Sequence, residues 1–172
     1  DEPVHQFDGQ RIRFFIGIDR RRSQYKGTDI MLRALEHVVA EHPEEAEMVR
    51  VESLPFAEYE QSMNSCDAML DQLYSYTPSM NSLLAMSKGI IVVGGGEPEN
   101  YEIIHETELR PIVNVEPTYE SVCRQLEWLI ANRQQIDRLK ADSIRYVKRH
   151  HDYRKVAARY AAMYQRLLQT KK

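Results

Sequence analysis

The sequence predicts an open α/β fold: a doubly wound parallel sheet with helices on both faces, followed by extra C-terminal helices. Two observations lead to this prediction. Short runs of β-branched and aromatic residues alternate with segments whose apolar residues recur at helical spacing, and the alternation continues through five strands. The run Ile-Ile-Val-Val at 90–93 is apolar throughout, as expected of a parallel strand that is buried on both faces.

Composition narrows the class of protein. The chain has 172 residues, which is one domain's worth, and its formal net charge of -3 argues against a nucleic-acid partner. Its apolar runs are too short to span a bilayer, so at most a peripheral membrane contact is expected. Two cysteines are too few for a disulfide framework and favour a reducing, cytoplasmic compartment. The six histidines lack metal-ligand spacing, so no metal is expected.

The first half of the chain predicts three strands and two helices. Residues 1–10 are polar, and we expect a leader or linker there, with the domain proper at 11–172. Thr28 suits a helix cap, and Pro55 suits the first turn of a helix. The expected elements are a strand at 11–18, a charged loop at 19–26, a helix from 28 to about 42, a strand at 48–54, a helix at 55–65 and a strand at 68–73.

The second half predicts two more strands and four helices. Thr77 and Pro78 form a cap and first position, and Gly89 ends the helix that they begin. Three glycines lead out of the next strand into an acidic loop. The expected elements are a helix from 78 to 88, a strand at 90–93, a loop at 94–102, a strand at 111–115, and helices that place apolar faces at 122–130, 136–147 and 153–168.

Ligands of such sheets bind at the C-terminal ends of the strands, near the switch in strand order, so loops that follow strands are the candidate sites. The first such loop, residues 19–27, contains Arg20, Arg21, Arg22 and Lys26. Arginine supplies a bidentate fork and lysine a point charge, which is the combination that a diphosphate needs. The simpler alternative is a solvated basic loop.

Two further loops add weaker signals. The helix that starts near Pro78 would present free backbone N–H groups at Ser79, Met80 and Asn81, which form an anion site at a helix N-terminus. The loop after residue 93 carries Glu97, Glu99 and Glu102, and carboxylates there would accept hydrogen bonds from sugar or ribose hydroxyls. Every helix has an N-terminus, however, and acids after three glycines equally fit a solvated turn.

Taken in order, these features resemble a known family. The chain carries Lys26-Gly27 after its first strand, a Leu-Pro-Phe turn at 54–56, Cys-Asp at 66–67, the stretch Leu-Leu-Ala-Met-Ser-Lys-Gly-Ile-Ile-Val at 83–92, and then glycines with acids. This order resembles the C-terminal, donor-binding domain of GT-B glycosyltransferases, in particular the retaining group called family 4. The resemblance covers about residues 11–168 and implies a Rossmann-like fold that forms one half of a GT-B enzyme.

The resemblance also implies roles for particular residues. Arg21 and Lys26 would hold the donor diphosphate, with Arg20 and Arg22 as neighbouring candidates, and the helix start at 79–82 would assist. Leu54 to Phe56 would lie beside the nucleobase. The donor would be a nucleotide-sugar, and the transfer would need no metal or other cofactor.

The chain departs from the family at both acidic positions of its Glu-x7-Glu motif. Tyr76 and Leu84 stand where the two glutamates are expected. Leucine accepts no hydrogen bond, so ribose hydroxyls would need another partner, and Glu99 or Glu102 is the hypothesis. The Tyr76 hydroxyl would partly replace the first acid.

A GT-B enzyme has two such domains with the active site between them. The resemblance therefore implies a longer hexosyltransferase in which a missing N-terminal domain binds a glycan or glycolipid acceptor, and the helix at 153–168 crosses back towards it. It implies bacterial polysaccharide biosynthesis in the cytoplasm, at the inner face of the membrane. We expect no turnover by this chain alone.

Two other classes remain open. The same fold with a degenerate donor site would serve as a non-catalytic binding or scaffold domain, which the missing acids favour. A receiver-type module would carry an acidic cluster and a phosphorylatable aspartate at its strand ends. Asp19 follows the first strand, but three arginines follow it, so this class ranks third.

Overall fold

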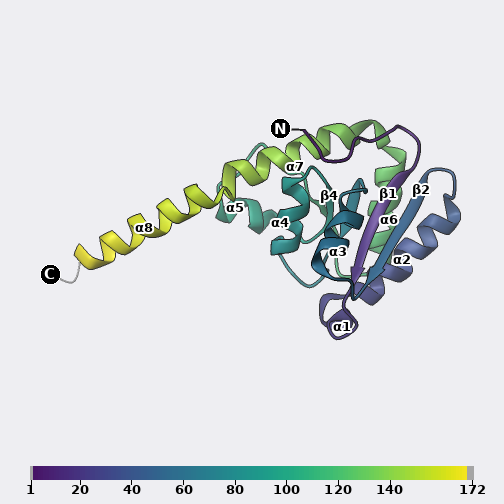
Figure 1. Ribbon diagram of the computed structural model, residues 1–172, viewed down its shortest axis with the longest axis horizontal. Helices are drawn as coiled ribbons and strands as arrows, with labels where there is room; N and C mark the ends of the chain where they lie inside the picture. Colours follow the sequence, from purple (N-terminus) through teal and green to yellow (C-terminus); the bar gives the residue numbers. More distant parts are fainter. Residues whose placement is uncertain (1, 170–172) are drawn as a thin grey trace.

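The computed structural model describes residues 2–169 and has the predicted α/β architecture (Figure 1). All strand pairs are parallel, and the order across the sheet is β2-β1-β3-β4-β5. The order therefore reverses between β1 and β3, which is the switch point of an open sheet. The strands are β1 (Ile12–Ile18), β2 (Ala46–Glu52), β3 (Ala68–Leu70), β4 (Ile91–Gly94) and β5 (Val113–Asn114).

Helices cover both faces of the sheet, as the continuous apolar strands predicted. On one face α2 packs with α6 against Phe14 and Ile16, and on the other α3, α4 and α7 surround Phe15 and Met69. Successive residues of β1 thus enter two separate cores. The helices are α1 (Ser23–Lys26), α2 (Thr28–Glu41), α3 (Phe56–Met63), α4 (Met80–Ser87), α5 (Pro98–Ile103), α6 (Tyr119–Ala131), α7 (Ile136–His150) and α8 (Tyr153–Gln169), with a 3-10 turn at Arg133–Gln135.

Three predicted helix starts were wrong. Helix α3 begins at Phe56, and Pro55 is its N-cap rather than a residue of its first turn. Helix α4 begins at Met80 rather than Pro78, because the Ser79 hydroxyl accepts the N–H groups of Asn81 and Ser82, both at 3.1 Å. Helix α2 includes Thr28 as its first residue, and its N-cap is Gly27, whose φ of 71° is favourable only for glycine.

Loop predictions also needed correction. The charged loop after β1 contains the short helix α1, and the loop after β4 contains α5, so Glu99 and Glu102 lie on a helix. Strand β3 ends at Leu70 instead of residue 73. Pro98 at the first position of α5 was the available signal for that helix.

The two ends of the described chain differ in how they meet the domain. Near the N-terminus, the Val4 N–H donates to the Lys88 carbonyl at 2.9 Å, and Phe7 packs against the core beneath α2 and α6. Helix α8 instead projects from the body with no buried residue (Figure 1). Among residues 2–169, no helix is long and apolar enough to cross a membrane.

Candidate functional site

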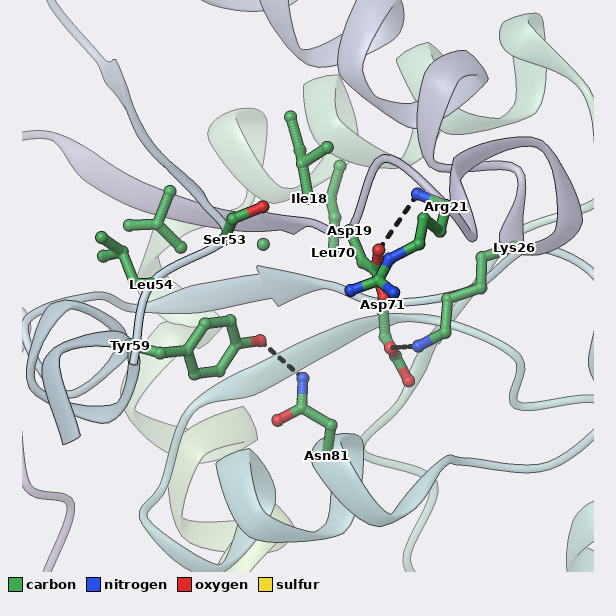
Figure 2. A pocket seen from close by; sticks show the side chains of 12 residues that line it. Ile18, Asp19, Arg21, Lys26, Ser53, Leu54, Tyr59, Leu70, Asp71 and Asn81 are labelled. Carbon is green, nitrogen blue, oxygen red and sulfur yellow. Dashed lines mark hydrogen bonds and ion pairs between the residues drawn. The ribbon is translucent and has the colours of Figure 1, made fainter. Parts of the chain in front are cut away.

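A cavity of about 400 Å³ opens at the C-terminal ends of β1, β2 and β3, beside the point where the strand order reverses (Figure 2). This is the position at which open α/β sheets bind ligands. Figure 2 shows a cationic side, a polar wall and an apolar end. The lining residues are Gly17, Ile18, Asp19, Arg21, Lys26, Val51, Ser53, Leu54, Tyr59, Leu70, Asp71 and Asn81.

The cationic side comes from the loop between β1 and α2. The backbone N–H of Arg21 donates to Asp19 Oδ1 at 3.0 Å, and the Lys26 ammonium lies 3.5 Å from Asp71 Oδ1. The Lys26 carbonyl accepts the Leu73 N–H at 2.9 Å, which fastens this loop to the segment after β3. A Cβ at residue 27 would lie 2.9 Å from the Leu73 side chain, so the close approach requires glycine. The arrangement places two cations where an anionic group can reach both.

Asp71 lies between the cations and the start of α4. Its side chain is 4% exposed and accepts hydrogen bonds from the hydroxyls of Ser79 and Ser82. Because Ser79 in turn caps α4, the carboxylate occupies the place beside the helix N-terminus that the sequence assigned to a ligand anion. Sequence reasoning missed Asp71, although an acid directly after a buried strand was a usable signal.

The polar wall is formed by Tyr59 and Asn81, where the Asn81 side-chain amide donates to the Tyr59 hydroxyl at 2.6 Å. The Tyr59 ring packs edge-on against Phe15, with centroids 5.0 Å apart. A Cβ at residue 17 would lie 2.5 Å from that ring, which explains the glycine in β1. Burial raises the pKa of Tyr59, so its hydroxyl stays neutral and can pair with other hydroxyls.

The apolar end of the cavity is formed by Ile18, Val51 and Leu54. The turn after β2 that places Leu54 passes through Ser53 with a φ of 53°, a left-handed conformation. The Ser53 N–H donates to the Ile18 carbonyl at 3.3 Å, which ties this turn to the end of β1. Together the three regions offer cations for an anion, an amide and a phenol for hydroxyls, and an apolar surface for a flat group.

The cavity brings together four of the residues assigned to donor binding from the sequence, namely Arg21, Lys26, Leu54 and Asn81. Arg20 lies outside it, where its exposed side chain is hydrogen-bonded to Glu52, and this hydrogen bond lowers the pKa of Glu52. Phe56 and Met80 are exposed at 64% and 81% and do not line the cavity. Asn81 contributes its side chain rather than a free backbone N–H, because Ser79 already accepts that N–H.

The other candidates lie elsewhere. Tyr76 lines a separate cavity of about 320 Å³, together with Tyr74 and Glu97, beside the ends of β3 and β4. Glu99 and Glu102 are exposed on α5 and line neither cavity. Leu84 is half-buried and packs against the core between the sheet and α4. The side chains from α3 and α4 that do reach the main cavity are Tyr59 and Asn81.

Comparison with solved structures shows the fold. The chain aligns with the Anabaena protein HepE, crystallised with UDP and glucose, at a TM-score of 0.64 and 14% identity, covering 88% of this chain and 48% of that one. It aligns with the C-terminal domain of the group 1 glycosyltransferase LpcC from Francisella tularensis at a TM-score of 0.58 and 17% identity, covering 83% and 87%. The pneumococcal O-GlcNAc transferase GtfA, in complex with UDP and GlcNAc, gives a TM-score of 0.62 at 9% identity, covering 97% and 38%.

The chain therefore has the Rossmann-like fold found in one half of GT-B glycosyltransferases. It spans about half the length of HepE but most of the LpcC C-terminal domain. No protein-family signature matches this sequence, and no curated protein sequence is significantly similar to it.

Proposed function

We propose that this chain is the donor-binding domain of a glycosyltransferase that moves a sugar from a nucleotide-sugar to an acceptor. The observation that carries the proposal is the cavity at the switch point, with Arg21 and Lys26 on one side and Leu54 at its apolar end. A nucleoside diphosphate has a matching distribution of charged, hydroxyl-bearing and flat parts. The shared fold of glycosyltransferases whose crystals contain UDP supports this assignment.

Under this proposal, Arg21 and Lys26 neutralise the diphosphate as it leaves. The bond between the anomeric carbon and the β-phosphate oxygen breaks, and its electron pair stays on that oxygen. The acceptor hydroxyl oxygen forms the new bond to the anomeric carbon, and its proton passes to the leaving phosphate oxygen and from there to water. Positive charges placed before the reaction stabilise the developing negative charge. Leu54 packs against the base, and the Tyr59–Asn81 pair faces the ribose, a role that the sequence assigned to Glu99 or Glu102.

The finer parts of the proposal concern the rest of the enzyme. We assign a retaining, metal-independent hexosyl transfer to a glycan or glycolipid, with the acceptor held by an N-terminal domain. Helix α8 supports this division, because it carries Tyr160 and Tyr164 at 55% and 58% exposure on a helix with no buried residue. A projecting helix with an apolar stripe fits a partner domain. The same assignment implies that this chain alone shows no turnover.

Calorimetric titration with UDP, GDP and ADP tests the proposal and identifies the base. One nucleotide should bind saturably, and Lys26→Ala and Arg21→Gln should each weaken binding by about tenfold. Arg20→Gln is the matched control, because Arg20 lies outside the cavity and should leave the affinity unchanged. Absence of binding to all three nucleotides, in a chain shown to be folded, would overturn the donor-site assignment.

One observation favours a second candidate, a non-catalytic scaffold domain. The cavity lining carries two acids, Asp19 and Asp71, beside its two cations, and the Lys26 ammonium is paired with Asp71. A site whose charges nearly cancel attracts a diphosphate less than two unopposed cations would. Under the scaffold alternative, none of the three nucleotides binds to the wild type, so the Lys26→Ala substitution has no nucleotide affinity to weaken.

A further inference from the structure

Asp71 is a buried negative charge inside a cavity that is otherwise suited to an anion. Its side chain is 4% exposed, whereas the Lys26 side chain that it faces is 27% exposed. The two serine hydroxyls bond to Oδ2, and Lys26 approaches Oδ1 at 3.5 Å, longer than a charge-assisted hydrogen bond. Asp71 is therefore held firmly by α4 and paired loosely with the lysine.

This geometry has a consequence for any phosphate that binds there. A phosphate that reaches Lys26 comes close to Asp71, because the ammonium and the carboxylate oxygen are 3.5 Å apart. Two like charges within several ångströms repel strongly where water is partly excluded. Asp71 cannot turn away, because the hydroxyls of Ser79 and Ser82 hold it. Asp71 therefore opposes each additional negative charge that the cations attract.

We propose that Asp71 is a charge selector: it makes the cavity bind a nucleotide-sugar in preference to the more highly charged nucleoside diphosphate that the transfer leaves behind. The inference rests on the proposed function. Breaking the sugar–phosphate bond turns a phosphodiester-like β-phosphate into a terminal one, which carries a further negative charge above its second pKa of about 6. The cations bind the donor, and Asp71 promotes release of the product.

The test compares the nucleoside diphosphate that binds in the titration with UDP, GDP and ADP and the β-phosphate methyl ester of the same nucleotide, which lacks the additional charge and carries no donor sugar. Both are titrated at pH 8 into the wild type and into Asp71→Asn, which keeps the shape of the side chain. We expect the substitution to increase the affinity for the diphosphate about tenfold and to change the affinity for the ester much less. Glu44→Gln is the control, because it removes the charge of an exposed side chain. Glu44 precedes β2 and therefore lies at the N-terminal ends of the strands, away from the cavity.

A purely structural role for Asp71 would give a different result. Loosening of α4 or Lys26 would weaken both ligands by the same factor, and that outcome would overturn the proposal. Asp71→Ser also removes the charge and should shift the ratio of the two affinities in the same direction if Asp71→Asn does not fold. If neither ligand binds the folded wild type, the proposed function itself fails, whereas binding of both with an unchanged ratio rejects the charge selector alone.

Discussion

Two aspartates at opposite ends of β3 differ in how closely they are paired with a lysine and in whether that lysine reaches solvent. Asp67 precedes the strand, is fully buried, and accepts the Lys140 ammonium at 2.8 Å and the Arg13 N–H at 2.9 Å. Asp71 follows the strand and lines the cavity, and its cationic partner is 3.5 Å away. Lys140 is fully buried, whereas the Lys26 side chain is partly exposed. One pair is closed to water and ligands, and the other is open to both.

The difference separates a buried ion pair at one end of the strand from a cavity-lining pair at the other, where we propose that a ligand binds. A closed ion pair is saturated by protein atoms, so removal of one partner leaves a buried charge without compensation. An open pair keeps a cation that a ligand can share, and it contributes little to folding. The free energy of unfolding and the affinity for nucleotides should therefore respond to substitutions at opposite ends of β3.

The largest expected effect is at the closed pair. Lys140→Met should lower the free energy of unfolding by about 3 kcal/mol, because it leaves the Asp67 charge buried with one partner fewer. Lys26→Met should cost less than about 1 kcal/mol, since two hydroxyls still hold Asp71 and water reaches the site. Urea unfolding of the two variants checks this, and equal losses would contradict the distinction.

A second buried acid, Glu106, follows α5 and is bonded to Arg149 and His150 at the C-terminal end of α7. Burial opposes ionisation of Glu106, but hydrogen bonds from His150, from the N–H groups of Leu109 and Glu108, and from Arg149 outweigh it and hold its pKa at about 2. A lowered pKa stabilises the fold above pH 4.5 and loses that contribution as the pH falls towards 2.

Glu106→Gln should therefore cost about 2 kcal/mol at pH 7 and clearly less at pH 3. Urea unfolding at the two pH values measures the difference from the wild type. Glu108→Gln is the control, because that side chain is 70% exposed although it also pairs with Arg149. A penalty at Glu106 that did not change with pH would show that shape, and not charge, matters there.

Ser79 links the open pair to α4, and its removal should have an intermediate effect. Ser79→Ala should lower the free energy of unfolding by about 1 kcal/mol, because it removes the N-cap of α4. Thr77→Ala, at the cap position predicted from the sequence, should leave the unfolding midpoint unchanged. Thermal unfolding of both variants distinguishes the two caps, and a larger loss at Thr77 would place the start of α4 elsewhere.

The smallest effect is expected at Arg20, which lies outside the cavity. Its exposed pair with Glu52 should contribute no measurable stability, so Arg20→Gln should leave the melting temperature unchanged. The substitution should still raise the pKa of Glu52 towards its usual value, because it removes the hydrogen bond from Arg20. A carboxyl titration followed by NMR measures this, and an unchanged pKa would show that the ion pair is not formed in solution.

Local residue patterns were enough to predict most of the fold. The apolar run at 90–93 and the β-branched and aromatic residues at 11–18 placed β4 and β1, because strand formation and burial follow chiefly from local residue type and spacing. Boundaries that depended on one side chain were less secure. Ser79 and Thr77 are both acceptable caps by residue type, and the contact between Ser79 and Asp71 distinguishes them.

By itself, the sequence determined the α/β class, the alternation of strands and helices that makes the sheet parallel, and the basic loop after β1. These features follow from residue type and spacing along the chain. Only the tertiary structure decided which basic residues face the cavity, that Asp71 opposes Lys26, and that Asn81 rather than Glu99 stands near them. Those contacts join residues from separate loops and helices, and they form only when parallel strands bring their C-terminal ends to one edge of the sheet.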